Sequence, residues 1–264
     1  MAELNLERQK DDMDGIYTVY HLHSDLSNGV TNIDSVTKYQ EYIDYAKSLG
    51  MKAMGFSEHG NILEWVHKKN AIEKAGMKYI HAEEFYVTED LFKYPDVSEI
   101  SESLSGTDEQ EAQNIIDDYI EKNKRQVRDN YHCVLIAKNY NGVKELNLLS
   151  SKAFLRDGHF YYQPRITIDE LINTSENILI TTACLGGILA KGNSKIQSKF
   201  LEFIIANKDR CYLEIQHHKD DMQIKYNQYL AMLSYKYNIP LIAGTDTHAL
   251  NDTHLKGRSI MQKS

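Results

Sequence analysis

Seven short apolar runs alternate with stretches that carry helix signals, and this alternation restricts the fold more than any other feature of the sequence. The runs cover 16–22, 52–57, 78–87, 133–137, 177–182, 211–216 and 240–245. Strands that alternate with helices build a mainly parallel sheet. In one chain of 264 residues, a sheet of this kind most naturally closes into an α/β, TIM-like barrel. We therefore expect a single domain over residues 1–264, with its chemistry at the C-terminal ends of the strands.

Residues that favour the start of a helix precede several of the stretches between the runs. Asp34, Asn61, Thr107 and Thr167 each stand where a helix is expected to open, and three of them are followed by Glu or Gln three residues later. A further helix is expected over 220–238. These helices would cover the outside of the barrel.

Two segments fall outside this alternation. Residues 1–15 are mostly polar and are expected to form an N-terminal tail, with none of the apolar character of a secretory signal. Residues from about 91 to 130 combine a long acidic stretch with a helix, and we expect a surface insertion there. No apolar run approaches the length of a membrane span. The three cysteines include no CxxC pair, so reduced thiols and a cytoplasmic location are expected, with no membrane partner.

The formal net charge of the chain is −8. Proteins that bind nucleic acid on their own are usually basic, because contacts with phosphates supply most of the affinity. This chain alone should therefore bind DNA or RNA weakly. Hydrolysis of phosphate esters is not excluded, because bound metal ions reverse the local charge.

Potential metal ligands follow five of the seven apolar runs. The residues concerned are His21, His23, His59, Glu84, Cys184, Asp246 and His248. Residues two apart on a strand point to the same side, and the ends of parallel strands converge on one rim of a barrel. A set of imidazole, carboxylate and thiol groups suits zinc, manganese or iron better than calcium or magnesium. So many ligands at one rim predict more than one ion, an arrangement that can activate water and stabilise a leaving oxygen.

Each of these residues also has an ordinary explanation when taken alone. A single His-x-His pair is a common accident, and Cys184 alone would more often be a small buried apolar residue. Glu83 and Glu84 are equally compatible with a solvated pair. His217 and His218 follow an apolar run, where a hydrogen-bonding role is favoured over metal ligation. The prediction of a metal site rests on the shared position of the ligands at strand ends.

Several segments together resemble the motifs of the PHP (polymerase and histidinol phosphatase) domain family. In order they are HLHSDLSNG, FSEHGN, EEFYV, YHCVLIAKNYNGVKELNLLSS, TTACLGGILA, YLEIQHH and AGTDTHALN. The phrases VLIAKNYNGVKELNLLSS and ACLGG are typical of the PHP domain at the N-terminus of bacterial DNA polymerase III α subunits rather than of the small phosphatases. The resemblance covers about residues 16–264.

The resemblance implies a distorted (β/α)7 barrel that holds up to three divalent ions. It adds His132, which precedes its apolar run, to the seven ligands named above. The sequence departs from the family pattern at Asn28, where an Asp or His usually follows the His-x-His pair, and Asp25 is a nearby carboxylate that would compensate. Glu58 and His218 are further candidates, either as ligands or as partners of ligands.

The activity that the resemblance implies is metal-dependent hydrolysis of phosphate esters, in polymerases a 3′–5′ exonuclease. The 3′ end of DNA would then reach the site through the remainder of the polymerase, with replisome proteins as further partners. Two alternatives stay open: a non-catalytic, metal-stabilised structural domain of the polymerase, and a small-molecule phosphatase of the histidinol-phosphatase type. The 264 residues contain no palm-type cluster of aspartates, so the chain itself should not polymerise DNA, and we expect it to be a fragment of a longer bacterial or phage-like polymerase.

Overall fold

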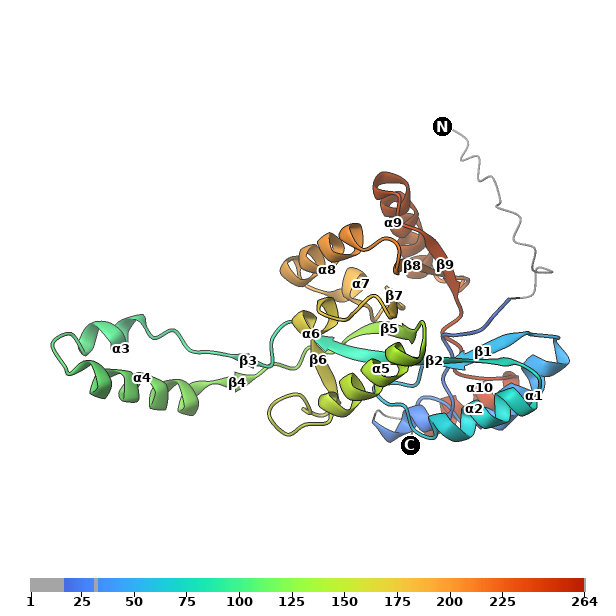
Figure 1. Cartoon of the computed structure of the whole chain (residues 1–264), viewed down its shortest axis with the longest axis horizontal. Coiled ribbons are helices and arrows are strands. Elements are labelled where there is room, and N and C mark those ends of the chain that lie inside the picture. The colour runs from blue at the N-terminus through green and yellow to red at the C-terminus, as the bar shows by residue number, and fades with distance from the viewer. Residues whose placement is uncertain (1–16, 31–32, 264) are drawn as a thin grey trace.

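The computed structural model describes residues 17–30 and 33–263, which fold around one curled sheet of seven strands (Figure 1). Six of them lie in the order β1 (Ala53–Phe56), β2 (Lys78–Thr88), β5 (Tyr131–Ala137), β7 (Ile178–Thr181), β8 (Cys211–Gln216) and β9 (Leu241–Gly244). The seventh, β6 (Arg165–Thr167), pairs with the far end of β2. Six of the seven predicted runs are thus strands of this sheet.

The run predicted over 16–22 has a different role, within its described residues. Val19 bridges Met54 of β1, and Leu22 bridges Thr247, just beyond β9. The backbone N–H of Gly55 donates to Val19 at 2.9 Å, and that of His23 donates to Thr247 at 2.9 Å. This segment therefore spans the gap between the two edge strands and closes the sheet into a distorted barrel, which confirms the predicted fold class.

The direction of β5 departs from a uniformly parallel barrel. The pairs β1–β2, β2–β6, β7–β8 and β8–β9 are parallel, whereas β5 is antiparallel to both β2 and β7. The chain leaves the end of β2, travels outward and returns to the same end of the sheet, so it must enter β5 in the opposite direction. This reversal matters for the site, because it brings the beginning of β5 to the mouth where the other strands end.

Helices cover the outside of the barrel. They are α1 (Tyr39–Ser48), α2 (Trp65–Lys74), α5 (Tyr140–Ala153), α6 (Ile168–Ile172), α7 (Ile188–Lys191), α8 (Ser194–Ala206), α9 (Asp221–Tyr237) and α10 (Asp252–Met261), with a 3₁₀ turn, η1, at Asp25–Gly29. The main apolar core lies between the sheet and helices α5 to α9, and a second core lies beneath α1 and α2. Within residues 17–30 and 33–263, no helix is long and apolar enough to cross a membrane.

The helix starts agree with the sequence in some places and not in others. The Thr167 hydroxyl accepts the Glu170 N–H at 3.2 Å and opens α6 as predicted, and α9 matches the helix expected over 220–238. Asp34 is not a helix cap, because α1 begins only at Tyr39 and the Asp34 carboxylate turns toward histidines. Asn61 also fails as a cap: its side chain accepts the Leu63 N–H at 2.9 Å, one turn before α2 begins.

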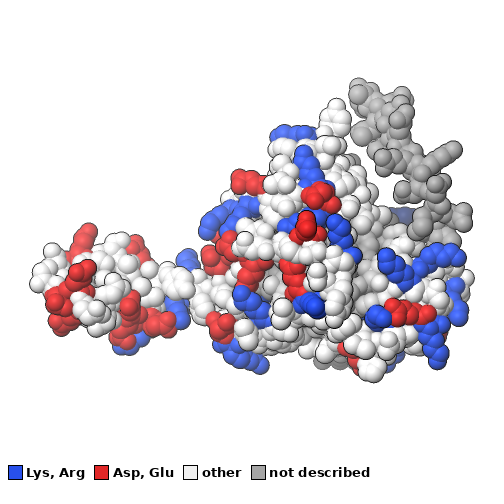
Figure 2. Space-filling view, viewed as in Figure 1, with Lys and Arg blue, Asp and Glu red and all other residues white. Residues whose placement is uncertain are grey.

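Between β2 and β5 the chain forms an arm that projects from the barrel (Figure 1). Its elements are β3 (Phe92–Lys93), α3 (Ser98–Ser103), α4 (Glu109–Asn123) and β4 (Arg125–Gln126). None of the residues that the structure describes in α3 and α4 is buried. The arm carries nine Asp and Glu against four Lys and Arg between 92 and 126, and acidic side chains gather on its surface (Figure 2). It occupies the region where the sequence predicts an insertion.

We expect the barrel to fold without this arm, because the arm adds nothing to either core. Replacing 94–124 with an Asn-Gly turn would join Lys93 to its ladder partner Arg125 directly. The midpoint of thermal unfolding should then shift by no more than about 4 °C, the size of a ~1 kcal/mol change in a domain of this length.

The matched control is Leu135→Ala, which removes a fully buried side chain from the main core. It should cost about 2–5 kcal/mol and lower the midpoint clearly. If removal of the arm is as damaging as this core substitution, the arm is an integral part of the domain.

Candidate metal centre

The eight residues that the sequence predicts as metal ligands form one connected cluster at a single mouth of the barrel. His21 and His23 lie in the segment over residues 17–23 that closes the barrel, called the closing segment below. His59 follows β1 and bridges Glu84 of β2. Asp246 and His248 follow β9, and Cys184 follows β7. His132 lies near the start of β5, which reaches the same mouth because β5 runs in reverse. A rule that looks for ligands only after strands therefore misses His132.

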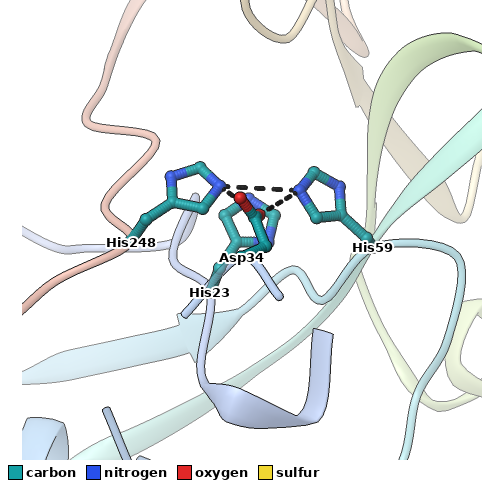
Figure 3. Close-up of side chains that lie close together, drawn as sticks. All are labelled: His23, Asp34, His59 and His248. Atoms are coloured by element: carbon teal, nitrogen blue, oxygen red, sulfur yellow. Dashed lines mark hydrogen bonds and ion pairs between the residues drawn. The ribbon is translucent and has the colours of Figure 1, made fainter. Parts of the chain in front are cut away.

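The cluster contains three groups of residues. Within each group, the ligand atoms all lie within 4.8 Å of one another. The first group is shown in Figure 3 and consists of His23, Asp34, His59 and His248. The second group consists of His21, His23, Glu84 and Asp246, and the third of His59, Glu84 and His132. Each pair of groups shares one residue: His23, His59 or Glu84. Of the three shared residues, Glu84 has two carboxylate oxygens and could face two neighbouring metal positions at once.

The Glu84 carboxylate lies at the centre and is fully buried. One of its oxygens, Oε1, is 3.0 Å from His132 Nδ1 and 3.3 Å from His21 Nε2. The other, Oε2, is 2.7 Å from His59 Nδ1 and 3.4 Å from His23 Nε2. A single carboxylate thus faces four imidazoles, which places it between the metal positions rather than at their edge.

Buried polar atoms without hydrogen-bond partners provide the test of whether cations fit here. In the described part of the chain, five such atoms have charged neighbours at 2.7–3.4 Å but no hydrogen bond of good geometry: His21 Nε2, His23 Nε2, His59 Nδ1, Glu84 Oε2 and Asp246 Oδ1. All five point into the same cluster. Unpaired buried polar groups are costly, and divalent cations would satisfy these lone pairs together. The imidazole and carboxylate donors therefore fit transition-metal ions.

The pKa values of the site describe a protonated, metal-free state. Burial alone would lower the pKa of His59, but Glu84 and Asp34 outweigh it and raise that pKa to about 10. Burial likewise opposes protonation of His21, yet Glu214, Asp246 and Glu84 raise its pKa well above the usual value. The pKa of His23 is lowered to about 4 by burial and by two neighbouring imidazoles. Protons on His21 and His59 thus offset the carboxylates where cations would otherwise do so.

Cys184 lies beside the third group without belonging to it. Its Sγ is 3.5 Å from His132 Nδ1 and 4.0 Å from Glu84 Oε1, and it accepts the Gly186 N–H at 3.3 Å. Burial and the carboxylates of Asp246 and Glu84 raise the pKa of this thiol well above its usual value. A neighbouring cation would reverse that effect and favour the thiolate.

Asp34 supplies a carboxylate that the sequence reading missed. Its Oδ2 is 2.8 Å from His59 Nε2 and 2.7 Å from His248 Nε2, while its Oδ1 accepts the Arg258 guanidinium at 2.6 Å. Burial opposes ionisation, but the two imidazoles prevail and hold the pKa of Asp34 well below its usual value. Asp34, six residues after Asn28, thus brings a carboxylate to the first ligand group, which Asn28 does not join.

Asn28 and Asp25 have structural roles instead of joining the three groups. The Asn28 side-chain oxygen accepts the N–H of Asp34 at 2.6 Å, and its amide donates to the Ser35 carbonyl at 2.7 Å. It thereby holds the loop that presents Asp34. Asp25 forms an ion pair with Lys38 and does not compensate at the cluster.

Glu58 and His218 also lie outside the three groups. Glu58 is buried, pairs with Lys68 at 3.1 Å and accepts the Ser27 hydroxyl at 2.6 Å. The Ser27 oxygen is 3.1 Å from His23 Nδ1, so this hydroxyl connects Glu58 to the site. His218 is exposed, and its ring stacks on His217 with centroids 5.0 Å apart.

A second carboxylate missed by the sequence reading is Glu214 of β8. Its Oε1 is 2.5 Å from His21 Nδ1, and its Oε2 accepts the Tyr20 and Thr181 hydroxyls at 2.9 and 2.7 Å. Gly244 leaves room for it, since a Cβ there would lie 2.0 Å from Glu214 Oε1. The carboxylate fixes the His21 ring so that Nε2 faces the cluster. The sequence signal that could have identified Glu214 is a charged residue within an otherwise apolar strand.

The sequence matches the family model described as PHP domain over residues 20–218. It is 30% identical over 239 residues to the DNA polymerase III subunit alpha of Borreliella burgdorferi, and 33% identical over 236 residues to that of Aquifex aeolicus. Each match covers 88% of this chain and 18% of the relative, so the chain spans less than a fifth of their length. An amidohydrolase from Chromobacterium violaceum, solved with bound sulfate, shares the fold, with a TM-score of 0.51, 11% identity, and coverage of 90% of this chain and 89% of that one.

The chain belongs to the PHP domain family. Within that family its curated relatives are α subunits of bacterial DNA polymerase III, as the motif phrases predict.

Replacing Glu214 with Gln should weaken metal binding about 10–100-fold, the usual cost of losing a carboxylate partner of a ligating histidine. The variant retains the side-chain volume but not the charge that orients His21. Competition with a chromophoric chelator would measure the change. Glu202→Gln, an exposed change on α8, is the control. Equal affinity in the Glu214 variant and the control would contradict the role assigned to Glu214.

Metal binding should release protons, because His21, His59 and Cys184 hold them in the metal-free protein. Their raised pKa values mean that affinity increases with pH across the neutral range, by roughly tenfold per pH unit for each proton displaced. Calorimetric titration with Zn²⁺ in buffers of different ionisation enthalpy would count the protons. An enthalpy that does not depend on the buffer would contradict this protonation pattern.

Proposed function

We propose that this domain is a metal-dependent phosphodiesterase that removes nucleotides from the 3′ end of DNA, as part of a polymerase III α-like protein. The observation that carries the proposal is the set of three ligand groups joined pairwise by His23, His59 and Glu84. A site for several ions close together is suited to in-line displacement at phosphorus.

The proposed ligands are the eight predicted residues together with Asp34. Histidine and carboxylate donors favour Zn, Mn or Fe, and the three groups have room for up to three ions. Bound ions would supply activation of water and neutralisation of the charge on the phosphodiester. The chain's own residues set the positions: Glu84 joins two groups, Glu214 orients His21, and Arg258 holds Asp34.

The choice of DNA as substrate rests on the polymerase relatives and on charge. The formal charge of −8 and the acidic arm predict weak binding of DNA by this chain alone. The remainder of a longer polymerase, together with replisome proteins in the cytoplasm, would therefore hold the 3′ end near the metal centre, and this chain alone would need a high concentration of primer to cleave it. Nucleotide polymerisation is not assigned to this chain.

A structural role for the metals is the second candidate, and the topology favours it. The ligands of the three groups come from six separate stretches of the sequence, and the closing segment is one of them. Ions at the mouth would cross-link the two edges of the barrel and stabilise the fold. A small-molecule phosphatase is the third candidate.

Protein loaded with Mn²⁺ should shorten a primer labelled at its 5′ end, one nucleotide at a time from the 3′ end. Asp246→Asn should reduce the rate by about 100-fold or more, since loss of even an outer partner of a ligand costs 10–100-fold. Asp209→Asn, an exposed change before β8, is the control and should leave the rate unchanged.

If folded, metal-loaded protein leaves single-stranded and mismatched primers intact, the exonuclease proposal fails. A large fall in melting temperature on chelation would then support the structural role. Turnover of phosphorylated metabolites without turnover of DNA would support the phosphatase.

A further inference from the structure

We propose that a cavity beside the metal centre binds the base of the terminal nucleotide, and that this base stacks on the side chains of His217 and His218. This inference rests on the proposed function and deepens it, because it names the part of the substrate that each region of the site contacts. The cavity has a volume of about 580 Å³, within the usual range for ligand pockets.

The cavity opens directly from the proposed ligands. Asp246 and His248 form part of its lining, so a group bound there lies next to the metal positions. His217 and His218, which follow β8, line it as well, and so do Leu255 and Arg258 of α10. A molecule that fills the cavity therefore contacts the metal centre. It also contacts the segment after β8 and helix α10, neither of which supplies a proposed ligand.

The two histidines offer an aromatic surface. Their rings are stacked with centroids 5.0 Å apart and planes inclined by 29°, and both side chains are exposed. Leu255, which is 49% exposed, adds an apolar surface to the same cavity. Aromatic side chains that stack on bases are the usual means by which proteins bind unpaired nucleotides.

The charges of the cavity favour a base over a second phosphate. Its guanidinium, from Arg258, pairs through one terminal nitrogen with Asp34 at 2.6 Å and its Nε is buried, while Asp252 adds a further carboxylate to the lining. A pocket built for an anion would leave its cation available. The phosphate of the substrate belongs at the metal positions, and the planar base belongs in the cavity. Stacking tolerates any base, so we expect little sequence preference.

The test compares His217→Ala/His218→Ala with His217→Phe/His218→Phe in the full chain loaded with Mn²⁺. Loss of one stacking contact should raise KM for a single-stranded primer about tenfold, with kcat little changed. The Phe pair restores an aromatic surface without a titratable nitrogen and should return KM close to that of the unaltered protein. His67→Ala, an exposed histidine on α2, is the control.

Binding of deoxyadenosine monophosphate, measured by calorimetry, separates this inference from the proposed function. Weaker binding in the Ala pair, with recovery in the Phe pair, supports the cavity even if the protein cleaves no DNA. An unchanged KM and unchanged nucleotide affinity in the Ala pair would overturn the inference while leaving the exonuclease intact. Failure of the Phe pair to recover, or an equal loss of affinity for inorganic phosphate, would also overturn it, because either result assigns the histidines to the phosphate.

Discussion

The buried carboxylate of Glu84 is the constraint on which the rest of the site depends. A fully buried anion is tolerated only when positive charge compensates it, and the Glu84 carboxylate faces four imidazoles that can carry protons or hold cations. Without metal, the balance is maintained by protons on His21 and His59, whose pKa values are raised. With metal, the same lone pairs would face cations. The closing segment, β1, β2 and β5 are therefore held together at the mouth by charge as well as by backbone hydrogen bonds.

Much of this arrangement could be predicted from the sequence, because each strand corresponds to a local run of apolar residues. Apolar runs gave six strands of the sheet, and the polar residues that follow them end at one mouth of the barrel. The direction of β5 could not be predicted from the sequence. This strand is antiparallel to β2 and β7, so His132 reaches the mouth from the start of its strand instead of following the strand's end. The closing segment was also predicted as an ordinary strand, although the backbone of its described residues pairs with its neighbours in isolated bridges.

The two missed carboxylates show a different limit. Asp34 has the features of a helix cap, and only the tertiary structure reveals that it faces His59 and His248 while Asn28 shapes its loop. Glu214 lies within an apolar strand, and its role depends on partners from other parts of the chain. These partners are His21, Tyr20 and Thr181. Local patterns predict which residues are available, whereas the pairing of charges depends on contacts between distant segments.

The proposed metal centre requires that the mouth of the barrel hold several divalent ions among the three ligand groups. Anomalous X-ray scattering from crystals grown with Mn²⁺ or Zn²⁺ tests it most directly, because it locates and identifies each ion. We expect separate peaks within the three ligand groups, with Glu84 between neighbouring ions. Density without anomalous signal at all three groups, in crystals saturated with metal, would contradict it.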